Sequence, residues 1–99
     1  MKTITLEEIE YKVIKDHKDG FDPESLTERY TEYFHPYEYI LGDWAYGKLR
    51  LKGFYKKGHK NCKELNNYEN VEKYLKTNCA HDCRYFILEK KNNFQMDSY

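Results

Sequence analysis

Basic and apolar residues alternate strictly from Lys48 to Lys52, and this pattern constrains the fold more than any other stretch of the chain. Successive side chains of a β-strand point to opposite faces, so Leu49 and Leu51 are expected to face a core. Lys48, Arg50 and Lys52 are then expected to face solvent. The chain must therefore contain a sheet with a covered face, and other elements with apolar surfaces must cover it.

The amino-acid composition favours one small globular domain. A length of 99 residues suits a single domain, and an aromatic fraction of 17%, including eleven Tyr, argues against a disordered chain. Seventeen basic and seventeen acidic residues cancel, so any nucleic-acid-binding surface must be a local patch. No apolar run reaches the roughly 20 residues of a membrane span, and the chain does not open with a signal-peptide pattern. We therefore expect a cytoplasmic protein.

Two helices are indicated by their boundary residues. Asp22 is a predicted N-cap followed by Pro23 at the first helical position, and Pro36 is expected to end this helix at His35. A capping-box spacing at Asn66 predicts a second helix, which should end near Asn78. Both segments have apolar residues at helical spacing, so each helix should cover a sheet.

The predicted elements follow in the order β-α-β-β-α-β. Strands are expected at residues 8–13 and 37–43, followed by the basic strand and by a last strand at residues 84–90. The last strand is apolar on both parities, which indicates a central strand covered on both faces. The predicted fold class is α+β, one domain with two helices packed on a mainly antiparallel sheet, and a ferredoxin-like arrangement is its simplest version. The domain should span residues 1–91, with a flexible tail at 92–99.

Several motifs in this sequence resemble those of one protein family. They are HKDGFDPE at residues 17–24, Gly42-Asp43-Trp44-x-Tyr46-Gly47, the stretch 49–54, and Cys79-x-x-x-Cys83-x-Tyr85-Phe86. The chain is similar to the YutD-like proteins of low-GC Gram-positive bacteria from about Tyr11 to Lys90, except in the loop at 56–63. The resemblance implies a small α+β cytoplasmic protein, and it implies no reaction.

The basic strand also predicts a binding surface. If the strand continues backward through Gly47, two aromatic side chains share a face with the three cations. Aromatic rings stack on bases and cations bind phosphates, which is typical of single-stranded RNA recognition. The residues predicted to bind RNA or another partner are Trp44, Tyr46, Lys48, Arg50 and Lys52. The competing interpretation is a solvated strand face on which Trp44 packs beside a turn.

A protein partner is the alternative to RNA for the same surface. Trp, Tyr and Arg also dominate the energetics of protein–protein interfaces. We therefore expect a small non-enzymatic binding module, either a regulatory RNA binder or a protein-interaction adaptor. The salt dependence of binding would separate them, because phosphate contacts weaken steeply with salt.

A cluster of Cys and His residues raises the hypothesis of a zinc site. The candidate ligands are His59, Cys62, Cys79 and Cys83, with His81 between the last two. The spacing is not that of common zinc motifs, and the competing interpretation is that Cys79 and Cys83 are small buried apolar residues. A disulfide between them is not expected in a reducing compartment. No other cofactor is expected.

The acidic residues indicate structural roles more than catalysis. Asp19 precedes Gly20 in a predicted turn, Asp22 caps a helix, and Asp43 follows Gly42 in another predicted turn. The sequence has no recognisable nucleophile–base pair and no Gly-rich phosphate loop. We therefore expect a protein that is not an enzyme.

Overall fold

The computed structural model describes residues 2–78 and 83–91 and forms one antiparallel sheet with two helices. The strands are β1 (Thr3–Leu6), β2 (Ile9–His17), β3 (Tyr39–Ala45), β4 (Lys48–Phe54) and β5 (Tyr85–Lys90). The helices are α1 (Pro23–Arg29) and α2 (Val71–Asn78), with 3-10 turns η1 (Glu32–Phe34), η2 (Glu64–Asn66) and η3 (Tyr68–Asn70). This arrangement confirms the predicted α+β class. The predicted tail at 92–99 lies outside the described residues.

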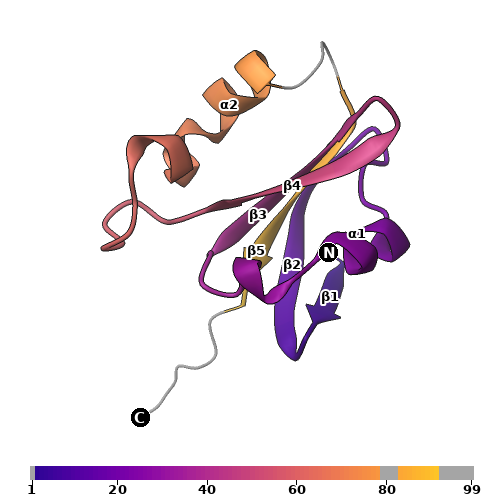
Figure 1. The fold of residues 1–99 in the computed structure, drawn as a ribbon, viewed down its shortest axis with the longest axis horizontal. Helices are drawn as coiled ribbons and strands as arrows, with labels where there is room; N and C mark the ends of the chain where they lie inside the picture. Colours follow the sequence, from indigo (N-terminus) through magenta and orange to yellow (C-terminus); the bar gives the residue numbers. More distant parts are fainter. Residues whose placement is uncertain (1, 79–82, 92–99) are drawn as a thin grey trace.

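The strand order is β1-β2-β5-β3-β4, and every neighbouring pair is antiparallel. The last strand in the sequence therefore lies at the centre of the sheet, as Figure 1 shows. The ferredoxin-like arrangement is wrong, because that topology is built from split βαβ units with parallel neighbouring strands. The difference arises because β1 adds a hairpin at one edge and β5 inserts between β2 and β3, antiparallel to both.

Side chains on the two faces of the sheet form two separate cores. We call them the α1-side core, which contains Leu26 of α1 together with Phe86 and Leu88 of β5, and the α2-side core, which contains Val71 of α2 and Ile87 of β5. Phe86 and Leu88 are fully buried and Ile87 is nearly so. The prediction that β5 is a central strand covered on both faces is confirmed, and the helices lie on opposite sides of the sheet.

Helix α1 begins where the sequence predicts and ends earlier. The carboxylate of Asp22 accepts hydrogen bonds from the backbone N–H groups of Glu24 and Ser25, which confirms the N-cap. The helix ends at Arg29, because Tyr30 adopts an extended backbone and turns its ring into the α1-side core. The hydroxyl of Tyr30 lies 2.6 Å from that of Tyr11, a buried contact that a continuous helix to His35 would not position in this way.

Helix α2 is preceded by two 3-10 turns. Asn67, not Asn66, accepts a hydrogen bond from the backbone N–H of Glu69 and starts η3, which leads directly into α2. The described part of α2 runs to Asn78, and the sequence predicts an end near this residue. Val71 of α2 is buried, with Tyr74 and Leu75 packed beside it against the α2-side core.

Candidate functional site

The β3–β4 hairpin decides which residues of the predicted binding surface lie together. Its two-residue turn consists of Tyr46 and Gly47, both with positive φ (54° and 75°), and the register pairs Trp44 with Leu49. Directly paired residues of neighbouring strands share a face, so Trp44 lies on the same face as Leu49, toward the α1-side core. Arg50 lies on the other face, so the assumption that a single strand runs through Gly47 is wrong.

Arg50 forms an ion pair within the sheet. Its Nε and Nη2 donate hydrogen bonds of 2.8 and 3.2 Å to the two carboxylate oxygens of Asp43, the residue directly opposite on β3. Asp43 is 2% exposed, whereas the side chain of Arg50 is 46% exposed. These hydrogen bonds raise the pKa of the Arg50 guanidinium. Arg50 therefore neutralises a buried carboxylate in this fold, which is a structural role.

Trp44 joins two distant segments of the chain. Its indole N–H donates a 2.8 Å hydrogen bond to the carbonyl oxygen of Gly20, and the guanidinium of Arg84 lies 4.8 Å from the ring centroid. Gly20 lies so close to the backbone of Tyr85 that a Cβ atom would approach it to 2.5 Å. Trp44 thus packs beside a turn. This is the position that the competing interpretation of the sequence, a solvated strand face, gives to this residue.

The remaining residues of the predicted surface are separated. Tyr46 is fully exposed at the tip of the hairpin, and Lys48 is exposed beside it. Lys52 is half-buried, with its ammonium 5.3 Å from the ring centroid of Phe54 and 5.5 Å from that of Tyr74. Lys48, Arg50 and Lys52 do share the α2 side of the sheet, but Trp44 does not join them. Their role in binding stays a prediction.

A row of aromatic rings, which we call the aromatic ladder, was not predicted as a site. It consists of Tyr33, Tyr37, Tyr55 and His59, with successive ring centroids 5.6, 4.7 and 4.3 Å apart. Gly53 makes room for it, because a Cβ atom there would lie 2.2 Å from the ring of Tyr37. The residues come from η1, from Tyr37 just before β3, and from the chain after β4, so no local periodicity in the sequence indicates that they meet.

A loop rich in Lys follows β4 and ends at η2. The lysine loop spans residues 56–63 and carries Lys56, Lys57, Lys60 and Lys63, all exposed, with no acidic residue among them. Within the described part of the chain none of these ammonium groups forms an ion pair. At the start of the loop, the carboxylate of Glu38 accepts a 2.7 Å hydrogen bond from a backbone N–H.

The structure describes three of the four candidate zinc ligands. His59 and Cys62 lie on the lysine loop, and Cys62 is a free thiol, whereas Cys79 lies outside the described residues. Cys83 is disulfide-bonded, so the expectation of a reduced buried thiol is wrong for this residue, and its sulfur is no thiolate ligand while the bond persists. Among residues 2–78 and 83–91 no three potential ligands gather into a metal site. A zinc site with these residues stays a prediction.

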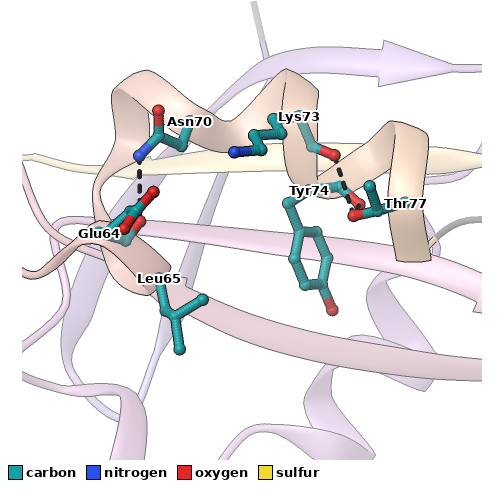
Figure 2. A pocket seen from close by; sticks show the side chains of 6 residues that line it. All are labelled: Glu64, Leu65, Asn70, Lys73, Tyr74 and Thr77. Carbon is teal, nitrogen blue, oxygen red and sulfur yellow. Dashed lines mark hydrogen bonds between the residues drawn. The ribbon is translucent and has the colours of Figure 1, made fainter.

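A small pocket lies between η2 and α2. It has a volume of about 110 Å³ and is lined by Glu64, Leu65, Asn70, Lys73, Tyr74 and Thr77. Figure 2 shows the side chains of Leu65 and Tyr74 on the same side of α2, with the hydroxyl of Thr77 bonded to the carbonyl oxygen of Lys73. Leu65 is 82% exposed, so the pocket is bordered by an unprotected apolar side chain.

Comparisons with known proteins identify the family. A model of the family described as "Putative antitoxin YutD-like" matches residues 5–89. The chain belongs to the YutD-like family. A relative described as "Putative antitoxin YutD", from Bacillus subtilis (strain 168), is 33% identical over 87 residues, which cover 88% of this chain and 96% of the relative. The YutD-like resemblance seen in the motifs is thereby confirmed.

The YutD-like fold is also known from a solved structure. The solution NMR structure of protein yutD from B. subtilis aligns with a TM-score of 0.79 and 30% identity, covering 97% of this chain and 87% of that one. None of the described helices is long and apolar enough to cross a membrane. The description of the YutD-like family names an antitoxin and no reaction.

Proposed function

We propose that this protein is an antitoxin that binds and neutralises a toxin protein in the cytoplasm, without catalysing a reaction. The descriptions of its family and of its Bacillus subtilis relative support the antitoxin role. An antitoxin that acts by binding needs a stable scaffold and an exposed contact surface. The sheet with a core on each face supplies the scaffold.

The observation that favours a protein partner over RNA is the division of the predicted RNA-binding face. Trp44 packs toward the α1-side core and Arg50 is held by Asp43, so neither presents a free ring or guanidinium as RNA stacking requires. Among residues 2–78 and 83–91, the large apolar side chains that are exposed are instead Tyr33, Tyr46 and Leu65, which lie in three different elements or turns. Exposed Tyr side chains such as Tyr33 and Tyr46 are typical anchors of protein interfaces.

Depletion of the protein in its host tests the antitoxin role. An antitoxin is required only while its toxin is made, so depletion should arrest growth, and suppressor mutations that restore growth should inactivate a second gene. The product of that gene should then bind the purified chain directly. Normal growth after complete depletion, in every growth phase and medium tried, would contradict the proposal.

An RNA titration separates the two kinds of partner. Labelled single-stranded RNA should bind the wild-type chain only weakly at low salt. Trp44→Ala and Arg50→Ala variants that remain folded should bind the RNA with the same weak affinity. Tight binding that falls steeply with salt and is lost in both variants would favour the RNA-binding alternative instead.

A further inference from the structure

The exposed end of the aromatic ladder is held in place by the rings behind it. Tyr33 is 65% exposed, yet its hydroxyl accepts a 3.1 Å hydrogen bond from the hydroxyl of Tyr37. Tyr37 in turn packs against Tyr55, which is 6% exposed. An exposed aromatic side chain that is already ordered loses little conformational entropy on binding, which makes it a suitable anchor for a partner.

The other end of the ladder lies within the lysine loop. The ring of His59 stacks on Tyr55 with centroids 4.3 Å apart and planes inclined by 23°. Its Nδ1 accepts a 3.0 Å hydrogen bond from the backbone N–H of Asn61, which leaves the proton of a neutral ring on Nε2. Two turns, closed by the backbone bonds from His59 to Lys56 and from Cys62 to His59, order the loop around this ring.

The charge of this region is not balanced locally. The whole chain has seventeen basic and seventeen acidic residues, whereas the eight residues of the lysine loop contain four Lys and no Asp or Glu. The carboxylate of Glu38 is bonded to the backbone N–H of Lys56 at the start of the loop, and the next acidic residue along the chain, Glu64, follows the loop in η2. The loop that contains His59, at one end of the aromatic ladder, thus carries four exposed Lys that form no ion pair with the described residues, and such a surface is complementary to negative charge.

We propose that the aromatic ladder and the lysine loop together form the docking surface for an acidic segment of the partner protein. This inference rests on the proposed function and names the chemistry of the partner. Carboxylates of the segment pair with Lys57, Lys60 and the Nε2–H of His59, and an apolar side chain of the segment covers Tyr33.

Occupied ring faces favour an acidic protein segment over single-stranded RNA at this surface. Bases need free aromatic faces for stacking. Tyr55 lies between Tyr37 and His59 and is buried, so the middle of the ladder has no face to offer. The lysines are point charges, which pair with carboxylates without the planar geometry that base recognition requires.

A titration followed by NMR tests the docking surface directly. The full-length, isotopically labelled chain is titrated separately with a short oligoglutamate peptide, with oligouridylate of the same negative charge, and with oligolysine, which has the opposite charge. Oligoglutamate should shift the amide signals of residues 56–63 and of Tyr33 in preference to the rest of the chain. Shifts elsewhere, no shifts at low salt, or larger shifts in this region with oligouridylate would overturn the proposal.

Charge-reversed variants supply a matched comparison. The double variant Lys57→Glu/Lys60→Glu should bind oligoglutamate roughly tenfold more weakly or worse. The control Lys15→Glu/Lys76→Glu changes the same amount of charge at exposed sites on β2 and α2, and it should bind as the wild type does. Equal weakening in both double variants would show a general charge effect and overturn the docking surface.

Complementation of the depleted host distinguishes failure of this inference from failure of the proposed function. The control variant should restore growth, whereas Lys57→Glu/Lys60→Glu and Tyr33→Ala should not, although circular dichroism shows all three folded. If every variant restores growth, the docking surface is wrong and the antitoxin role stands. If depletion does not arrest growth at all, the proposed function is wrong, and the oligoglutamate titration still decides whether the surface binds acidic segments.

Discussion

The indole N–H of Trp44 donates a hydrogen bond to the carbonyl oxygen of Gly20, 24 residues away, at 2.8 Å. This bond joins the turn before α1 to the end of β3. The guanidinium of Arg84, over the ring of Trp44, also donates a 2.9 Å hydrogen bond to the carbonyl oxygen of Asp19. Segments preceding α1, ending β3 and preceding β5 are thus fastened to one another at one end of the sheet.

Replacing Trp44 by Phe should destabilise the fold through the loss of this bond. Phe keeps an aromatic ring against the α1-side core but leaves the Gly20 carbonyl without its donor, which should cost about 0.5–1.5 kcal/mol. Urea unfolding followed by circular dichroism measures the difference. Tyr46→Phe, at a fully exposed turn position, is the control and should change stability by less than about 0.5 kcal/mol. Equal stability of Trp44→Phe and wild type would contradict the structural role of the bond.

Replacing Arg50 by Ala should destabilise the protein more than replacing Lys48. Asp43 is almost completely buried and loses both guanidinium donors, which should cost about 1.5–3 kcal/mol, whereas Lys48→Ala at an exposed site should cost less than about 0.5 kcal/mol. Chemical denaturation measures both. The double variant Asp43→Asn/Arg50→Ala should be more stable than the sum of the single changes implies, because the uncompensated charge is gone. Additive losses would show that the two residues do not interact.

Asp22→Ala should destabilise the protein by about 1 kcal/mol through the loss of the α1 N-cap. Asp22→Asn is the matched variant, because Asn keeps an oxygen that accepts the same backbone N–H bonds and caps helices about as well. Thermal and urea unfolding of the two variants should therefore differ. If Asn is as destabilising as Ala, the cap bonds do not account for the effect.

Alkaline pH should weaken the fold between about pH 10 and about pH 12. The hydrogen bond with Tyr33, followed by burial, raises the pKa of Tyr37 to about 12, and burial followed by the charge of Glu89 raises the pKa of Tyr39 to about 12. An unfolded Tyr ionises near pH 10, so ionisation above that pH favours the unfolded chain until the folded phenols also ionise. The contribution of these two phenols to the free energy of unfolding should thus be constant below about pH 10 and fall above it.

Urea midpoints measured across this range test the alkaline loss. Tyr39→Phe removes one of the two phenols and should flatten the dependence of stability on pH. A wild-type midpoint that does not change up to about pH 12 would contradict the hydrogen bond of Tyr37 and the burial of Tyr39 as causes of raised pKa values.

Local patterns in the sequence were sufficient for several elements of the fold. Asp22 followed by Pro23 marks the start of α1 because an N-cap is set by neighbouring backbone N–H groups. The run from Phe86 to Leu88 is apolar on both parities, and the structure buries it on both faces. Such features depend on a few consecutive residues, which is why they can be read without the tertiary structure.

The faces of the candidate site could not be predicted in the same way. Parity counting back from Arg50 places Trp44 on the same face. The strands expected at 37–43 and 48–52 require a connection between them, but Tyr46 adopts a positive φ that residues other than Gly, Asn and Asp rarely take, so the sequence lacks the Asn-Gly signal of a two-residue hairpin turn. The aromatic ladder depends on Gly53 leaving space for Tyr37, a contact between segments that no periodicity connects.

The central position of β5 governs when this chain can become a folded protein. Its first hairpin, β1–β2, and its second, β3–β4, have no strand pairing with each other, and within the sheet both pair only with β5, which follows them in the sequence. During translation, β2 and β3 therefore each keep one unpaired strand edge until residue 90 has left the ribosome. These edges can meanwhile pair with other chains or be attacked by proteases. A product truncated before β5 lacks the strand that pairs with both β2 and β3, so it cannot form this sheet, and its unpaired strand edges make it a substrate for degradation.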